Sequence, residues 1–377
     1  MSDTPRRKLE LTQINVIRSA AMGWIFFHHL WHGMRPYEGL PGLLGGAWDQ
    51  FLVSGALGVT IFNIITGFVL SLSYLGPQGG APSPGFKDFL SRRFLRICPN
   101  YYMAMIFFTL LTPLVLGVDN PGRLLVSTLE RLVFLQSMDT YNLTTNMAAY
   151  WWLGLLAQFY LAFPFLLRFF RAVGPGRAFA VIAVGSWILY KLVFMFGPMV
   201  GFSGWYLVGF SMSLLGMFPE FALGMWMAWC YRRGDAAEDS PARPWAPFAR
   251  PFRLFTLAVA AFFVIGQSTS LIQGVPEKYY LGAAGCLLFL VAVMSLPSME
   301  RLGRVRPVAW VAAASYSIYL THQPILSFLA PVTRDWSLAG KFIFQTLVCG
   351  LLSLVAAYFL DKAVARWNDR KKVATPA

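Results

Sequence analysis

The stretch Phe51-Leu-Val-Ser-Gly-Ala-Leu-Gly-Val-Thr-Ile-Phe-Asn-Ile-Ile-Thr-Gly-Phe-Val-Leu-Ser-Leu-Ser-Tyr74 runs without a single charged side chain. About 20 apolar residues in a helix are enough to cross the roughly 30 Å hydrocarbon core of a bilayer. This stretch therefore predicts a transmembrane helix. Similar stretches recur along the whole chain.

Nine further apolar stretches of similar length predict an all-α, polytopic transmembrane bundle of about ten spans in one membrane domain, 1–377. A shorter stretch, Leu124 to Gln136, contains Glu130 and Arg131, and we expect an interfacial or re-entrant helix there. The nine further stretches are 13–33, 99–117, 148–168, 178–197, 205–229, 254–273, 279–297, 308–330 and 340–361.

The composition excludes a water-soluble fold. Charged residues make up 13% of the chain, against about 25% in soluble domains, and the mean hydropathy is +0.56. A net charge of +14 would suggest a nucleic-acid partner in a soluble protein. In a membrane protein the positions of the basic residues explain it, so the predicted partner is the lipid bilayer and no nucleic acid.

Basic residues lie mostly on alternate connections between the predicted spans. With a cytoplasmic N-terminus, 23 of the 31 Lys and Arg fall on the inner side and 6 on the outer side. Because cytoplasmic loops are enriched in Lys and Arg, this asymmetry predicts that both termini are cytoplasmic. We expect a multi-pass protein of a bacterial cytoplasmic (inner) membrane.

Ionisable groups inside a bilayer are costly and usually functional, and the first predicted span contains two that share a face. Arg18 and His29 are eleven residues apart, which is close to three helical turns and a rise of about 16 Å. We predict that both side chains serve one site, although Arg18 reaching the inner interface as a simple anchor is the alternative.

The other histidines are His28 and His32 in the first predicted span and His322 in the ninth. His322 either converges with His29 on one pocket or only bonds a neighbouring helix near the kink expected at Pro324. His28 and His32, spaced i, i+4, raise the question of a metal site. Four histidines in the whole chain are too few for a membrane di-iron enzyme, so no metal is predicted, and His28 and His32 are expected at the outer interface.

Several segments, taken in order, resemble a known family. Arg18 with His29 fits an Arg-x10-His pattern, Gly58 to Phe68 a GVxxFFxxSGF helix with Asn63 and Thr66 as departures, and Arg93 to Tyr101 an RxxRIxPxY segment. Phe218 to Gly224 fits pEFxxG, and Ser315 to Pro324 fits SYxxYxxHxP. The chain resembles the polytopic acyltransferase family 3 of membrane O-acyltransferases over nearly its whole length.

One position departs from the family pattern. Trp151 to Tyr160 resembles WxLxxExxFY, but Leu156 occupies the acidic position. The role of that carboxylate cannot be carried over to this chain, and the change suggests a subgroup with a different acceptor.

The resemblance implies an enzyme that takes an acyl group, commonly acetyl, from cytoplasmic acyl-CoA and passes it to a hydroxyl of a glycan or glycolipid. Acyl-CoA, commonly acetyl-CoA, is then a donor substrate. No cofactor is expected to be bound permanently. Arg92, Arg93 and Arg96 are candidates to hold its phosphates, or they are only positive-inside anchors. His29 is the candidate general base, with Arg18 and His322 in the catalytic site, and an acyl-His intermediate stays open.

Other functions remain open from the residues alone. A secondary transporter could use Arg18, His29 and Lys191 as a path through the membrane, although no matching pair of broken helices appears in the two halves. A membrane subunit without chemistry is a further alternative. If the chain is an acyltransferase, a small glycoside such as a macrolide is an alternative acceptor.

Overall fold

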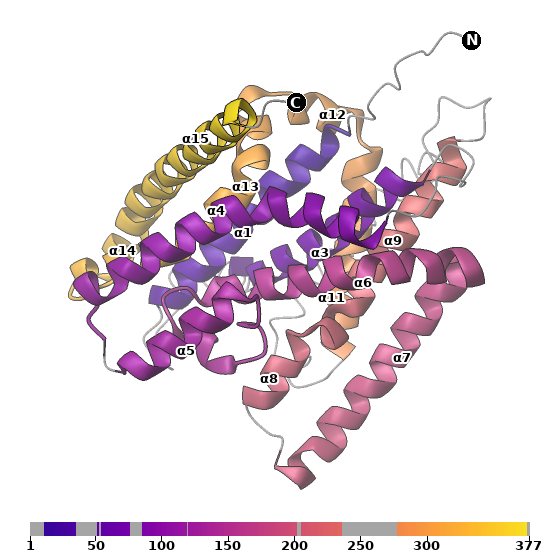
Figure 1. Ribbon diagram of the computed structural model, residues 1–377, viewed down its shortest axis with the longest axis horizontal. Coiled ribbons are helices and arrows are strands. Elements are labelled where there is room, and N and C mark those ends of the chain that lie inside the picture. The colour runs from indigo at the N-terminus through magenta and orange to yellow at the C-terminus, as the bar shows by residue number, and fades with distance from the viewer. Residues whose placement is uncertain are drawn as a thin grey trace.

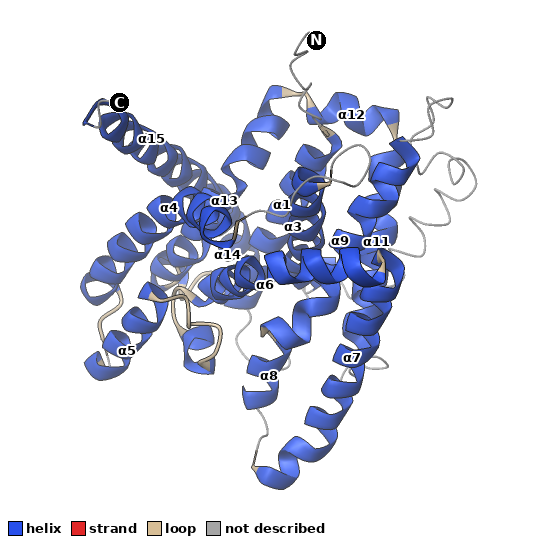
Figure 2. Ribbon diagram, turned by 45° about the vertical axis from the view of Figure 1, so that its right-hand side comes forward, coloured by secondary structure: helices blue, strands red, loops and turns tan. Residues whose placement is uncertain are grey.

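The computed structural model describes residues 11–34, 51–52, 54–75, 85–118, 120–201, 205–235 and 277–374, and within them every regular element is helical (Figures 1 and 2). The predicted all-α class is confirmed. The stretch 254–273, predicted as a span, lies outside the described residues.

Long helices carry most of the described chain, and short helices join them. The long ones are α1 (Gln13–Met34), α3 (Leu57–Tyr74), α4 (Phe86–Val115), α6 (Trp151–Val173), α7 (Pro175–Phe196), α9 (Leu214–Asp235), α11 (Glu277–Ser295), α13 (Arg306–Leu329) and α15 (Gly350–Ala374). The short ones are η1 (Ser54–Ala56), α5 (Pro121–Leu132), η2 (Thr140–Thr144), η3 (Ala148–Tyr150), η4 (Gly197–Val200), α8 (Trp205–Ser211), α12 (Pro297–Gly303), η6 (Pro331–Thr333), α14 (Leu338–Phe344) and η7 (Gln345–Cys349).

Among the described residues, five helices are long and apolar enough to cross a membrane, or six if the bent pair within 285–303 forms one span. These helices indicate an integral membrane protein. Helices α1 and α13 do not belong to this set. α1 contains Arg18 and three histidines, and polar groups of this kind lower the hydropathy of a helix that is buried in a bundle. The prediction of ten spans therefore stays a prediction. The five are Ser54–Tyr74, Phe86–Val115, Ala148–Val173, Pro175–Val200 and Leu338–Asp369.

The centre of the bundle is formed by two closely packed helix pairs, α3 with α9 and α1 with α13. In the first pair the backbones nearly touch. A Cβ on Gly224 would lie 1.9 Å from the carbonyl oxygen of Ile64, and one on Gly67 would lie 2.2 Å from that of Phe221. Small residues permit such approaches in membrane bundles, so these two motif glycines fix the crossing of α3 and α9.

The helix ends that the charge pattern assigns to one side of the membrane also lie together. Thr12 donates from Oγ1 to the carbonyl oxygen of Glu300 (3.0 Å), and Arg171 donates to that of Tyr74 (2.9 Å). In Figure 1 the start of α1 and α12 lie at the top, whereas α5 and α8 lie at the bottom. This arrangement is compatible with cytoplasmic termini, and the orientation itself stays a prediction.

The predicted single span at 205–229 is wrong in its continuity. The structure has two helices there, α8 and α9, separated at residues 212 and 213. The hydroxyl of Ser213 donates to the carbonyl oxygen of Phe210 (2.7 Å). A serine side chain bonded to the backbone in this way competes with the helical hydrogen bonds and favours a break.

The weaker stretch from Leu124 to Gln136 overlaps α5, a helix of 12 residues that ends at Leu132 and is too short to span. The side chain of Asn120 accepts a hydrogen bond from the backbone N–H of Arg123 (3.0 Å) and caps its start. At its end Tyr101 and Tyr102 of α4 donate to the carbonyl oxygens of Arg131 and Leu132. Its position relative to the membrane stays a prediction.

Candidate active site

The two predicted histidines from the first and ninth stretches meet. His322 Nε2 of α13 lies 2.9 Å from His29 Nδ1 of α1. His322 Nδ1 lies 2.8 Å from the carbonyl oxygen of Tyr319 and 3.2 Å from that of Ile318. Carbonyl oxygens only accept hydrogen bonds, so Nδ1 of His322 carries its proton and its Nε2 accepts from Nδ1–H of His29. Neutral His29 then has its lone pair on Nε2.

The helix around His322 is held by a residue from another element. Pro324 has no N–H, so the carbonyl oxygen of Leu320, four residues earlier, loses its usual partner. The hydroxyl of Tyr150 donates to this oxygen (2.8 Å), and the hydroxyl of Tyr319 donates to the carbonyl oxygen of Ala149 (2.6 Å). Both bonds are buried and join α13 to η3. The chain around Pro324 is thereby fixed next to His322.

His28 and His32 lie together on another part of α1, with ring centroids 4.6 Å apart. His28 also contacts His29 edge-on at 5.4 Å. Among the residues that the structure describes, no three or more His, Cys, Asp or Glu side chains are arranged so that they could hold a metal ion. The two rings thus pair one turn apart on α1, and their place at the outer interface stays a prediction.

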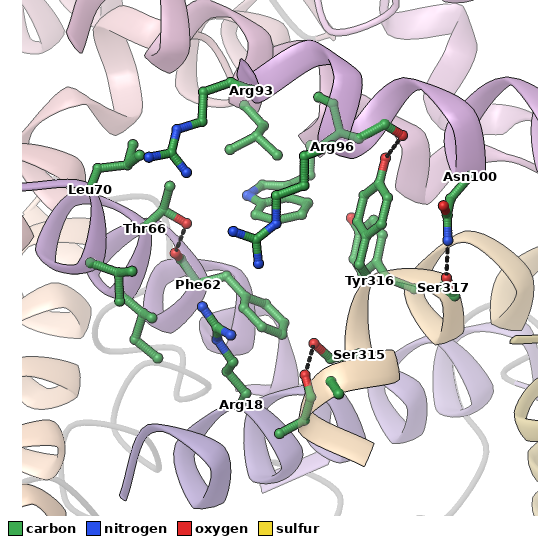
Figure 3. Close-up of a pocket in the computed structure, with 18 of the residues that line it drawn as sticks. Arg18, Phe62, Thr66, Leu70, Arg93, Arg96, Asn100, Ser315, Tyr316 and Ser317 are labelled. Carbon is green, nitrogen blue, oxygen red and sulfur yellow. Dashed lines mark hydrogen bonds between the residues drawn. The ribbon is translucent and has the colours of Figure 1, made fainter. Parts of the chain in front are cut away.

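Three arginines face one cavity of about 320 Å³ (Figure 3). Arg18 comes from α1, whereas Arg93 and Arg96 come one turn apart from α4. Figure 3 shows the three guanidinium groups pointing into the same space. Like charges this close repel one another, so an anion between them would be stabilised. The predicted Arg92 does not line the cavity and is exposed.

One carboxylate at the cavity wall was not singled out from the sequence. Asp361 Oδ1 of α15 accepts from Asn100 Nδ2 of α4 (2.6 Å) and from the hydroxyl of Ser317 of α13 (2.6 Å), and Asn100 Nδ2 also lies 2.7 Å from the Ser317 oxygen. This cluster joins three helices at the cavity. Asp361 could have been found as the acidic residue that ends the 340–361 stretch.

A second buried polar network involves Glu220, an ionisable residue within a predicted span. Its two carboxylate oxygens accept from Thr60 Oγ1 (2.9 Å) and from Asn63 Nδ2 (2.7 Å). Asn63 Oδ1 in turn accepts from Trp152 Nε1 (2.8 Å). The departure Asn63 is therefore a link between α9 and α6. The sequence marked Asn63 only as a departure from the family pattern, because its partners Glu220 and Trp152 lie on other helices.

The departure at Leu156 lies in the cavity itself. Helix α6 presents Trp152, Leu156 and Tyr160, spaced four residues apart, to the same space as the three arginines. A carboxylate at 156 would offset part of their charge, and leucine does not. Of the described residues that line the cavity, Asp361 is the acidic one, so arginine charge exceeds carboxylate charge there.

The cavity approaches the histidine pair through Tyr319. This residue lines the cavity, and its ring centroid lies 5.5 Å from that of His322. Trp152 contacts Tyr319 edge-on at 5.2 Å. A cavity lined by arginines, with a paired imidazole next to its Tyr319 wall, has the parts needed to hold a charged donor and to remove a proton from a hydroxyl.

The chain belongs to the acyltransferase 3 family: the family model, described as an acyltransferase domain, matches residues 11–362. The resemblance based on motifs is confirmed.

Two of the curated relatives are named for peptidoglycan. The chain is 22% identical to YrhL of Bacillus subtilis, named as a candidate peptidoglycan O-acetyltransferase, over 82% of this chain and 50% of that protein. It is 22% identical to the peptidoglycan O-acetyltransferase OatA of Listeria monocytogenes over 74% of this chain and 46% of that protein. It is 26% identical to Nodulation protein 10 of Rhizobium leguminosarum over 84% and 83%. The chain thus spans about half the length of the first two, and no solved structure matches it.

Proposed function

We propose that this protein is a membrane O-acetyltransferase that moves an acetyl group from acyl-CoA to a hydroxyl of a glycan. The observation that carries the proposal is the hydrogen-bonded pair His29–His322 beside a cavity lined by three arginines. The family and the names of the relatives support O-acetyl transfer and a glycan acceptor.

The donor would bind by its phosphates. Coenzyme A carries several phosphate groups, and arginine pairs phosphate through two parallel hydrogen bonds. Arg93 and Arg96 are on the part of α4 that the charge pattern predicts at the cytoplasmic face, where acyl-CoA is available. Arg96 is exposed, whereas Arg93 and Arg18 are half-buried.

His29 would act as the general base. Its Nε2 lone pair takes the proton of the acceptor hydroxyl while the hydroxyl oxygen attacks the thioester carbonyl carbon. The carbon–sulfur bond then breaks, and the leaving thiolate receives the proton from the His29 imidazolium. His322 is a positioning residue, because it fixes the tautomer of His29 by accepting from Nδ1–H, as the carboxylate does in a hydrolase triad.

We infer ten spans with both termini in the cytoplasm of a bacterial inner membrane, in a single domain. The acceptor would approach the histidines from the side opposite the arginines. A glycan polymer is preferred over a glycolipid or small glycoside because the relatives OatA and YrhL are named for peptidoglycan.

The test uses the full chain in proteoliposomes, supplied with acetyl-CoA and a fragment of a peptidoglycan glycan strand. We expect thiol release that depends on the acceptor and matches, mole for mole, the ester detected on the glycan by mass spectrometry. Uptake of acetyl-CoA or glycan into the vesicles without thiol release would instead identify a transporter. Thiol release and ester formation both absent in folded protein would overturn the proposed function.

A further inference from the structure

We propose that Trp152, oriented by Asn63, limits the length of the acyl group that the donor cavity accepts. The inference rests on the proposed acyl transfer and adds a specificity-determining residue to it. Trp152 is the second residue of α6, is 6% exposed and lines the cavity.

Two aromatic contacts hold the indole ring of Trp152. Its centroid lies 5.6 Å from that of Phe62 of α3 and 5.2 Å from that of Tyr319 of α13. Both partners also line the cavity. The three rings therefore form a wall contributed by three different helices, and a wall of this kind yields little to an extra methylene group because interiors are closely packed.

Hydrogen bonding fixes the orientation of the same ring. Nδ2 of Asn63 must donate to Glu220, which only accepts when ionised, so Oδ1 of Asn63 is turned to Trp152 Nε1–H. Thr60 occupies the other oxygen of Glu220. Glu220 thus fixes the orientation of the Asn63 amide, and the amide oxygen faces the indole N–H. The indole ring keeps this hydrogen bond in only one orientation.

The wall lines the same cavity as the arginines and contacts His322 through Tyr319, so we place the acyl group of the donor against it. The arginines that would hold the donor phosphates and the Trp152–Tyr319 contact line the same cavity, and Tyr319 leads on to His322. An acyl group delivered from the arginines towards the histidines therefore reaches Trp152 and Tyr319. Acetyl adds one carbon beyond the thioester carbonyl, whereas butyryl adds three and meets the rings.

The experiment measures kcat/KM for acetyl-, butyryl- and hexanoyl-CoA with the full chain and a fixed glycan acceptor. One methylene in an apolar pocket changes the rate by about tenfold or more. We expect the native chain to prefer acetyl over butyryl by at least about tenfold. In Trp152→Ala this ratio should fall to near one. Asn63→Ala should give a smaller change in the same direction, because the ring remains but loses its acceptor.

Trp226→Ala is the matched control. Trp226 lies on α9 and stacks on Phe179 with centroids 5.7 Å apart, away from the residues that line the cavity. It should keep the native chain-length ratio. Coenzyme A binding by calorimetry shows that each variant is folded, and Trp152→Phe, a smaller truncation, serves if Trp152→Ala does not fold.

The possible failures are distinguishable. A native chain that transfers no acyl group overturns the proposed function. A native chain that transfers acetyl and hexanoyl groups equally well overturns this inference alone. So does a Trp152 variant that binds coenzyme A normally and keeps the native ratio. If Trp152→Ala loses the ratio and Asn63→Ala keeps it, the role given to Asn63 is wrong.

Discussion

Arg92 and Arg93 are neighbours on α4, but only Arg93 lines the cavity. Replacing Arg93 by Gln removes one charged donor, and a hydrogen bond to a charged group is worth about 1.5–3 kcal/mol. We expect coenzyme A binding to weaken roughly ten- to hundredfold for Arg93→Gln. Arg92→Gln, with the same change of charge on an exposed side chain, should alter it little. Calorimetry in detergent measures both, and equal losses would assign these arginines to long-range charge alone.

The sequence predicted the arginines and histidines of the site but missed Asp361 and the neutral residues. Arg18, His29 and His322 could be selected because an ionisable group inside a bilayer is energetically costly and usually has a function. Asn100, Ser317 and Trp152 could not, because polar and aromatic residues are common in spans. Their role depends on partners from other helices, such as Asp361 and Asn63. Arg92 lies with Arg93 and Arg96 on one predicted cytoplasmic connection, and only the structure separates it from the cavity.

The crossing of α3 and α9 depends on a glycine that tolerates no side chain. In Gly224→Ala the new Cβ would overlap the carbonyl oxygen of Ile64, so the helices must separate at a cost of about 1–3 kcal/mol. We expect a lower Tm in detergent. Gly185→Ala on α7 is the control, since a Cβ there meets nothing within 4 Å, and its Tm should be unchanged or raised. An unchanged Tm for Gly224→Ala would contradict the close approach of these helices.

Most helices agree with the predicted stretches, because length and apolarity determine them. The predicted 279–297 and 308–330 correspond to α11 and α13 within two residues. The break between α8 and α9 was not predicted, because it follows from a local bond of Ser213 and not from hydropathy. The hydrogen bond from Tyr150 to the carbonyl oxygen that Pro324 leaves without a partner was not predicted either. It joins Tyr150 to Leu320, 170 positions apart in the sequence.

Across the whole molecule, the charge asymmetry predicts which surfaces face the cytoplasm. Ser240→Cys, in a connection outside the described residues, should resist an impermeant thiol reagent added outside whole cells. Val200→Cys should react, because Val200 is 82% exposed and lies on a connection predicted to face outwards. Both are made in a background lacking the four native cysteines. Labelling of position 240 and protection of position 200 would reverse the orientation. The number of spans is tested separately by scanning the remaining connections.

The central claim is that His29 is the general base, and its neighbour His28 supplies the sharpest comparison. The initial rate of acetyl transfer is measured for His29→Ala and His28→Ala at matched protein level, with coenzyme A binding as the check on folding. Loss of a general base costs about 10²–10⁴-fold. The account predicts that loss for His29→Ala, with coenzyme A binding retained, and less than about a tenfold loss for His28→Ala. An active His29→Ala beside an inactive His28→Ala would contradict it.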